Sequence, residues 1–313
     1  PGHHRVGVID PPATPAPPPA VPTRPLLAFA WMCGAISCFT MSALAGREAQ
    51  ASIHAVELTA WRSLIGLAVI GLLLALHPRG FGQVRTGLPW THLQRSGIHF
   101  IGQIAWFMAL TMIPLAQVVA IEFTNPIWVA LLAPFMLGER ITRRRALAVV
   151  LGFAGVLIVT RPEVAGLGAG QALALLAAFC FAMNAILTRR IMARDTVLCV
   201  LFWMGVIQSL LGFAGVLAMG AGLPPASAWI WVFAVAFAAL GGHYCLTSAL
   251  GHAPASLVVP MDFLRLPTVA FVGALVYGET LEAALFFGAA VIIAANLLSL
   301  GDGRDRSVKA SRG

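Results

Sequence analysis

Residues 115 to 140 read LAQVVAIEFTNPIWVALLAPFMLGER, a stretch apolar enough to cross a membrane although it carries Glu122 and Asn125 near its middle. Residues 255 to 280, ASLVVPMDFLRLPTVAFVGALVYGET, align with this stretch without a gap. The acid recurs in the second copy as Asp262. A fixed offset over this length would rarely arise by chance, so the chain is predicted to consist of two halves of similar design.

The composition places the chain in a bilayer. Of its 313 residues, 59% are hydrophobic and only 10% are charged, which leaves too little polar surface for a soluble domain of this size. The basic residues form short clusters between apolar runs, so their excess indicates membrane topology and excludes nucleic acid as a partner. The five cysteines lie inside apolar segments, and neither a disulfide framework, a metal site nor a cofactor is indicated.

Apolar runs long enough to cross about 30 Å of hydrocarbon follow one another through most of the chain. Before them, residues 1 to 25 are rich in proline and predict a disordered cytoplasmic tail rather than a signal peptide. After them, residues 301 to 313 predict a basic cytoplasmic tail. The ten predicted helices are Leu26 to Ala45, Val56 to Leu76, Ser96 to Met112, Leu115 to Leu137, Ala146 to Val159, Gln171 to Ile191, Val197 to Met219, Ala228 to Leu250, Ala255 to Tyr277 and Ala283 to Leu300.

The distribution of arginine and lysine tests this topology, because cytoplasmic loops accumulate positive charge. With both termini in the cytoplasm, the outer loops hold only Arg47 and Arg161. Five helices per half is an odd number, so the second half must enter the membrane from the opposite side. The predicted fold is therefore an all-α integral membrane protein with ten transmembrane helices in two inverted five-helix repeats, residues 26 to 160 and 167 to 300. Secondary transporters use this architecture and bind substrate near the midplane, where the halves meet.

Three motifs carry a resemblance to a known family: IEFTNPIWVALLAPFMLGER, GFAGVLIVTRP and VVPMDFLRLP. Together with the duplicated pattern from Leu26 to Leu300, they resemble the EamA-type members of the drug/metabolite transporter superfamily. The resemblance implies a permease of the cell inner membrane with ten helices and two repeats, and it does not fix a substrate. The closing helix of the first half departs from the pattern at Ala148, where glycine is common, as at Gly288 in the second half.

Ionisable groups within a membrane span cost several kcal/mol unless they face protein or water, so each is a candidate for the translocation pathway. Glu122 and Asn125 share one helix face, and Asp262 and Arg265 repeat their spacing. We expect the two pairs to face each other, with Asp262 bonded to Arg265 and Glu122 beside a neutral neighbour. Two interpretations stay open: an internal ion pair that fastens the helices, or a site for substrate or protons, with Glu122 as the proton carrier.

Further polar residues complete the set of candidates. His243 aligns with Gln103 at the same offset, and each can be a hydrogen-bonded core residue or part of the pathway. Arg62, next to Trp61, can be an interfacial anchor or can hold an anionic substrate group. Glu139 and Glu279 lie at helix ends and are expected to fix loops through arginine or backbone amides.

The function predicted from these features is a secondary carrier that moves a small metabolite or amphipathic solute by alternating access, with proton coupling or exchange left open. The alternatives are a membrane-embedded enzyme, which the missing HExxH and GxSxG motifs disfavour, and a channel or scaffold. The expected partners are a small-molecule substrate and the lipid bilayer, and a homodimer is left open.

Overall fold

The computed structural model describes residues 24–137, 142–161, 168–253 and 255–310, and their regular structure is entirely helical. The proline-rich tail and the first Gly-Glu motif, with Glu139, lie outside these residues. The last helix runs to Ala310, beyond the Leu300 expected from the sequence. The helices are α1 (Pro25–Ala49), α2 (Ala55–Leu76), a 3₁₀ helix η1 (Gly80–Val84), α3 (Pro89–Met112), α4 (Leu115–Glu122), α5 (Asn125–Leu137), α6 (Arg143–Thr160), α7 (Ala169–Ile191), α8 (Val197–Ala218), α9 (Ala226–His252), α10 (Ala255–Asp262), α11 (Arg265–Tyr277) and α12 (Ala283–Ala310).

Six helical segments of the described chain are long and apolar enough to cross a membrane: Pro25–Ala49, Ala55–Leu76, Leu115–Leu132, Ala169–Ile191, Val197–Ala218 and Ala226–His252. Two shorter apolar helices, Ala146–Thr160 and Ala283–Leu298, lie outside this set. Large apolar side chains such as Phe135, Leu217 and Ile230 are exposed, as they would be against lipid. The chain therefore has the surface of a multi-pass membrane protein.

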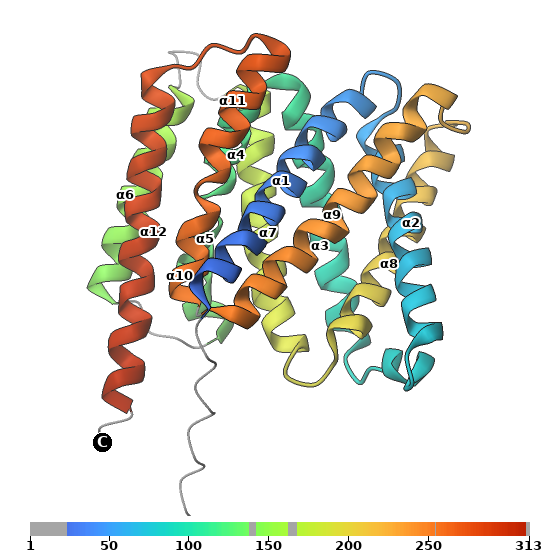
Figure 1. Ribbon diagram of the computed structural model, residues 1–313, viewed down its shortest axis with the longest axis horizontal. Helices are drawn as coiled ribbons and strands as arrows, with labels where there is room; N and C mark the ends of the chain where they lie inside the picture. The colour runs from blue at the N-terminus through green and yellow to red at the C-terminus, as the bar shows by residue number, and fades with distance from the viewer. Residues whose placement is uncertain (1–23, 138–141, 162–167, 254, 311–313) are drawn as a thin grey trace, which may run out of the picture.

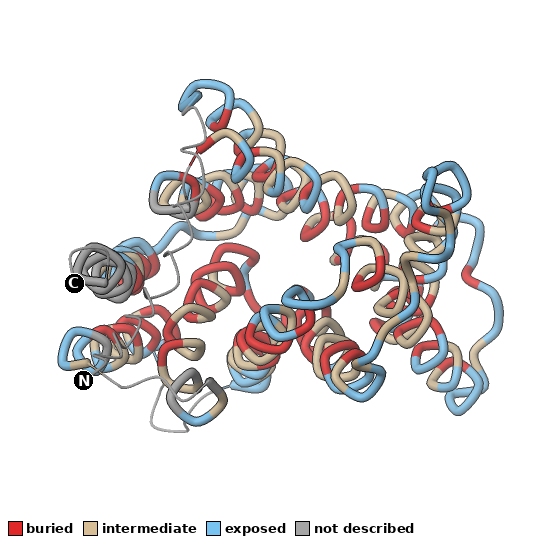
Figure 2. Tube along the Cα trace, turned by 90° about the horizontal axis from the view of Figure 1, so that it is seen from below, coloured by how far each residue is buried: buried red, intermediate tan, exposed pale blue. Residues whose placement is uncertain are grey.

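The main helix pairs join the first half of the chain to the second: α1 packs on α9, α2 on α8, α3 on α7, α6 on α12 and α4 on α11 (Figure 1). Buried residues lie on the faces that the helices turn toward one another (Figure 2). Small residues permit the close approaches. A Cβ on Gly155 would lie 2.9 Å from the Gly288 carbonyl oxygen, and one on Gly212 would lie 2.7 Å from Ala60 Cα. Gly155 and Gly212 therefore lie where only a small residue allows the two helices to approach so closely.

Two segments expected as continuous helices are each broken at the acid. In the first half α4 ends at Glu122 and α5 begins at Asn125, and in the second α10 ends at Asp262 and α11 begins at Arg265. Proline causes part of each break. Pro126 has no N–H to donate to the carbonyl of Glu122, four residues earlier, and Pro267 has none for Phe263. The breaks put the polar residues at helix ends rather than in the middle of a helix.

A backbone carbonyl at each break accepts a hydrogen bond from outside the regular helical pattern. Asn296 of α12 donates its side-chain N–H to the Phe123 carbonyl at 2.7 Å. In the second half, Leu266 N–H donates to the Phe263 carbonyl at 3.2 Å. Pro267 therefore does not leave the Phe263 carbonyl free, because an N–H three residues on replaces the missing donor four residues on.

Candidate functional site

The two helix breaks meet through Arg265. Its guanidinium donates to Glu122 Oε1 at 3.0 Å and to Asp262 Oδ2 at 3.3 Å. Arg265 is 8% exposed, and the packing of α11 on α4 brings it to the acid of the other half. Of the first pair, Glu122 faces the second pair as expected. One buried cation thus joins two carboxylates from opposite halves of the chain.

Glu122 is more fully bonded than the sequence suggested. Trp106 of α3 donates its indole N–H to Glu122 Oε2 at 2.8 Å, so both carboxylate oxygens accept a hydrogen bond. The expectation that Glu122 has only a neutral neighbour is wrong, because the cation comes from the other half of the chain and not from position 125. Asn125 makes no hydrogen bond to another side chain among the described residues and does not join the cluster.

Aromatic rings and free polar atoms complete this cluster. The Arg265 guanidinium carbon lies 5.0 Å from the centre of the Phe123 ring and 5.4 Å from that of Phe39. Asp262 Oδ1 and Arg265 Nε are buried and have no hydrogen-bond partner among the described residues. The Asp262 side chain keeps 27% of its accessible surface against 17% for Glu122. Asp262 is therefore the less constrained of the two acids.

A second polar cluster centres on Gln208, near the middle of α8. Gln208 is 1% exposed, and its Nε2 lies 2.7 Å from His99 Nδ1 and 3.4 Å from the Ser96 carbonyl oxygen, both on α3. Its Oε1 accepts from Arg62 at 3.5 Å and from Ser63 at 3.4 Å, both on α2. One amide thus connects three helices deep in the bundle.

Arg95 extends this second cluster along α3. It is 6% exposed and donates from Nε to the Thr188 hydroxyl at 2.6 Å. Arg95 NH1 and Arg62 Nε are buried without a hydrogen-bond partner. Neither guanidinium forms an ion pair with an acid of the described chain. This cluster therefore carries positive charge that no neighbouring carboxylate neutralises.

His243 and Gln103 remain separate from both hydrogen-bonded clusters. The His243 ring packs edge-on against Phe39, with the ring centres 5.6 Å apart, and its side chain is exposed. The positive charges of Arg62, Arg95 and Arg265 all act on it. Gln103 is half-buried and has no side-chain hydrogen bond to a described residue. His243 thus lies within electrostatic reach of both clusters without bonding to either.

Glu279 fastens one end of the bundle. Its carboxylate forms an ion pair with Arg47 at the end of α1 and accepts the Leu115 N–H, at the start of α4, at 3.0 Å. Beside it, the Tyr277 hydroxyl donates to Glu48 Oε1 at 2.6 Å. The expectation that Glu279 fixes a loop through an arginine and a backbone amide is confirmed.

His92, Asp195 and Cys199 form a group whose polar atoms lie within 4.8 Å of one another. His92 Nε2 and Asp195 Oδ2 are 2.7 Å apart, and the Thr86 hydroxyl donates to the same oxygen at 2.5 Å. No metal-ligand motif in the sequence links these three residues. Because His92 and Thr86 already bond Asp195, the group fastens α3 to the segment between α7 and α8.

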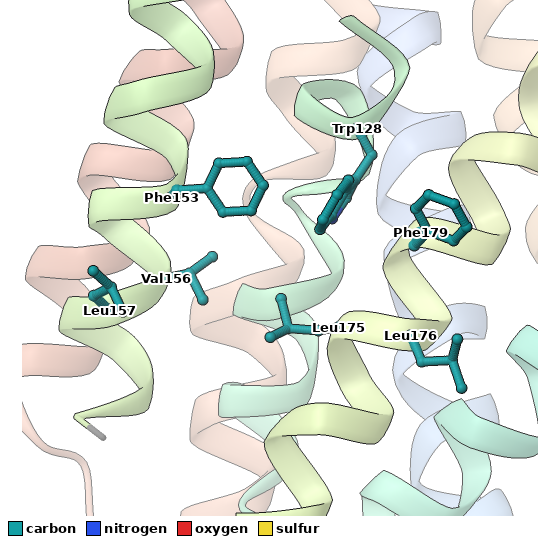
Figure 3. A pocket seen from close by; sticks show the side chains of 7 residues that line it. All are labelled: Trp128, Phe153, Val156, Leu157, Leu175, Leu176 and Phe179. Carbon is teal, nitrogen blue, oxygen red and sulfur yellow. The ribbon is translucent and has the colours of Figure 1, made fainter. Parts of the chain in front are cut away.

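A pocket of about 520 Å³ lies between α5, α6 and α7 (Figure 3). Trp128 stands between Phe153 and Phe179, with ring centres 5.0 and 5.4 Å away. The rest of the lining is aliphatic, and the Trp128 indole N–H is buried without a partner. This pocket contains none of the charged candidates, so it is distinct from both polar clusters.

The fold therefore brings together some of the residues predicted from sequence and adds others. Glu122, Asp262 and Arg265 meet, whereas Arg62 joins a different cluster. Sequence reasoning missed Arg95, His99, Gln208 and Asn296 as members of polar clusters. A lone amide in an apolar helix was the available signal for the last two, as in LFWMGVIQSLL and VIIAANLLSL.

Apolar helices joined by buried charged clusters, with broken helices at their centre, define a class of membrane transport protein. The sequence model of the EamA-like transporter family matches residues 26–161 and again residues 168–301. The chain belongs to this family, and its members are transporters rather than enzymes.

Three relatives are 23% to 31% identical to this chain over the aligned residues. A riboflavin transporter from Brucella anthropi is 31% identical over 251 residues, 78% of this chain and 87% of the relative. One from Rhizobium johnstonii is 29% identical over 232 residues, 74% and 77% of the two chains. An S-adenosylmethionine uptake transporter from Rickettsia bellii is 23% identical over 255 residues, 78% and 83%. A crystal structure with 21% identity has a TM-score of 0.60 and shares the fold over 89% of this chain and 98% of its own.

Proposed function

We propose that this protein is a secondary carrier that moves a small organic metabolite across the cell inner membrane by alternating access. The observation that carries the proposal is the pair of helix breaks at Glu122 and Asp262, joined by Arg265 at 3.0 and 3.3 Å. Discontinuous helices near the midplane of two related halves are where secondary transporters bind substrate and coupling ions. Buried charge at such a place is costly unless it has a function.

The proposed architecture is ten membrane-spanning helices in two inverted repeats, residues 26 to 160 and 167 to 300. The direction of packing supports it. Gly205 of α8 faces Leu67 of α2, whereas Gly215, further along α8, faces Val56, nearer the start of α2. These two helices hold the same place in each half and run antiparallel. A twofold axis in the membrane plane relates helices in this way, and an axis along the membrane normal does not.

The proposed orientation places both termini in the cytoplasm. Its support is that residues expected on one side of the membrane contact one another. Arg47, Leu115 and Glu279 meet at one end, and Arg161 pairs with Glu282, all expected outside. The Arg24 N–H donates to the His252 carbonyl at 2.9 Å, and both of these are expected inside. The start of α1 and the end of α12 lie at the same end of the bundle (Figure 1).

The substrate class follows from the relatives, which carry riboflavin or S-adenosylmethionine by name. We place the pathway between the halves, lined by Glu122, Asn125, Asp262 and Arg265 with Gln103, His243 and Arg62 nearby. The surrounding partner is the lipid bilayer, and neither metal nor cofactor takes part.

If transport is coupled to protons, Asp262 is the acid we assign to the coupling. Glu122 accepts two hydrogen bonds, whereas Asp262 accepts one and has a second oxygen without a donor. Asp262→Asn is then expected to abolish accumulation under an imposed pH gradient and to preserve substrate exchange. Exchange needs alternating access but no net proton movement. Accumulation by Asp262→Asn equal to wild type would remove Asp262 from this role.

Counterflow in proteoliposomes tests the carrier itself. Vesicles loaded with unlabelled riboflavin or S-adenosylmethionine should take up the labelled compound transiently and with saturation, which a channel cannot do. Chemically unchanged substrate separates transport from catalysis. Substitution of cysteine at Thr142 and Thr280 tests the orientation, because a membrane-impermeant reagent should label the two from opposite sides. Labelling of both from one side would contradict the inverted repeats.

A further inference from the structure

Two arginines inside the bundle differ from the arginines of the described chain that form ion pairs. Arg47, Arg161 and Arg265 each form an ion pair with a carboxylate. Arg62 and Arg95 form none, although Arg95 is only 6% exposed. Breaking a buried pair by removing one partner is strongly destabilising, because the remaining charge is left without compensation. The structure thus holds the buried guanidinium of Arg95 and the half-buried one of Arg62 without a carboxylate partner among the described residues.

The side chains near Arg62 and Arg95 can contribute to a binding site but cannot neutralise the positive charge of the two arginines. Gln208 contacts Arg62 at 3.5 Å and His99 at 2.7 Å, which connects α2 to α3 through α8. His99 follows Arg95 by one helical turn on the same face of α3. The charges of Arg62 and Arg95 both act on His99 and on His243. Several hydrogen-bond donors thus gather in one region together with a surplus of positive charge.

The free donors show what the site lacks. Arg62 Nε and Arg95 NH1 are buried without a hydrogen-bond acceptor, and the one bond from Arg62 to Gln208 is long, at 3.5 Å. Guanidinium groups bind carboxylate and phosphate through short, charge-assisted and often bidentate hydrogen bonds. An anion placed between α2, α3 and α8 would supply both the missing negative charge and the missing acceptors.

We propose that Arg62, Arg95, Gln208 and His99 bind the anionic group, a carboxylate or a phosphate, of the transported substrate. The inference rests on the proposed function, because it names the substrate class of that carrier. It adds a second element to the pathway: the Arg265 cluster joins the helix breaks of the two halves, and the Arg62 and Arg95 cluster binds the anionic group of the cargo.

Binding of inorganic phosphate to the full chain in a non-ionic detergent tests the site without knowledge of the substrate. Phosphate at constant ionic strength is expected to raise the melting temperature of the wild type, since a ligand that binds only the folded state stabilises it. Arg62→Gln and Arg95→Gln should each weaken the apparent affinity about tenfold or more. The matched control is Arg161→Gln, an exposed arginine paired with Glu282, which should respond as the wild type does.

Additional variants and ligands keep the outcomes distinct. If a glutamine variant does not fold, Arg62→Lys and Arg95→Lys keep the charge but lose the planar donor pair, and they should bind phosphate more weakly than the wild type. Riboflavin 5′-phosphate compared with riboflavin isolates the phosphate group on one scaffold. Equal phosphate stabilisation of wild type, Arg62→Gln and Arg95→Gln overturns the proposal. So does stabilisation of the wild type by phosphatidylglycerol but not by phosphate, because the site would then belong to lipid.

Counterflow separates this inference from the proposed carrier. Exchange of an anionic solute at equal rates by the wild type and by Arg62→Gln would leave the carrier intact and overturn the anion site. Phosphate binding that the arginine variants lose, in a protein without any exchange activity, would support the anion site and overturn the carrier.

Discussion

The two buried clusters differ in how their positive charge is balanced. Arg265 lies between Glu122 and Asp262, at 3.0 and 3.3 Å, and two aromatic rings cover it. Arg62 donates to the Gln208 amide and lies over the Phe107 ring, and Arg95 donates to the Thr188 hydroxyl, so neither has a carboxylate partner among the described residues. The first cluster is complete within the protein, and the second lacks an anion. The difference indicates that the first cluster joins the two halves without an external ion, whereas the second is completed by a bound anion.

The helices that carry the clusters fit this division. The complete cluster lies where α4 meets α11, at equivalent helix breaks in the two halves, and the acid of each half shares one cation. The incomplete cluster is spread over α2, α3 and α8, where Gln208 bonds Arg62 and His99, whereas Arg95 bonds the Thr188 hydroxyl. Removing a charge should therefore lower the free energy of unfolding strongly in the first cluster and change it little in the second.

The largest effect is expected from Arg265→Gln. This change leaves Glu122 and Asp262 without their shared cation, and an uncompensated buried charge costs about 3–5 kcal/mol. The measurement is the free energy of unfolding in mixed micelles, with the loss of helix monitored by circular dichroism. A loss below about 1 kcal/mol, the size of an exposed pair, would remove the distinction between a complete and an incomplete cluster.

The next effect compares the two acids. Glu122→Gln should reduce the free energy of unfolding by about 2 kcal/mol and Asp262→Asn by about 1 kcal/mol, because Glu122 accepts two hydrogen bonds and is the more buried. The same micelle titration on both variants gives the difference. A larger loss for Asp262→Asn would reverse the ranking and make Asp262 the main partner of Arg265.

Asn296→Leu is expected to cost about 1–3 kcal/mol, because the Phe123 carbonyl at the first helix break loses its buried donor. The second break has a backbone donor instead and does not depend on α12 in this way. The control is Leu297→Ala, on the exposed face of α12, which should change the free energy of unfolding little. If Asn296→Leu is as stable as the wild type, the break in α4 and α5 does not depend on α12.

The smallest effect on stability is expected from Arg62→Gln, within about 1 kcal/mol of the wild type and with no fixed sign. Removal of an unpaired cation relieves its burial cost and sacrifices only a long hydrogen bond to Gln208. Thermal unfolding in the absence of ligand measures it. A loss as large as that of Arg265→Gln would mean that Arg62 fastens helices, contrary to its assignment to the incomplete cluster.

Part of the site could be predicted from the sequence because it is duplicated. The repeated spacing at residues 122 and 125 and at 262 and 265 indicated that the polar positions meet, and Arg265 contacts Glu122. The partner of Glu122 could not be predicted, because Arg265 was assigned to the acid on its own helix. An ion pair between residues 143 positions apart depends on the packing of α4 against α11. The same holds for Gln208, whose contacts come from α2 and α3.

Four features could be predicted from the sequence without a structure: the chain is helical, lies in a membrane, carries two related halves and resembles the EamA-type transporters. Hydropathy, helix period and a repeated motif are local properties, and they can be read along the chain. Only the tertiary structure decided where the helices break and which buried charges are neutralised. The physical reason is that the energy of a buried charge depends on atoms within a few ångströms, and those atoms come from helices far apart in the sequence.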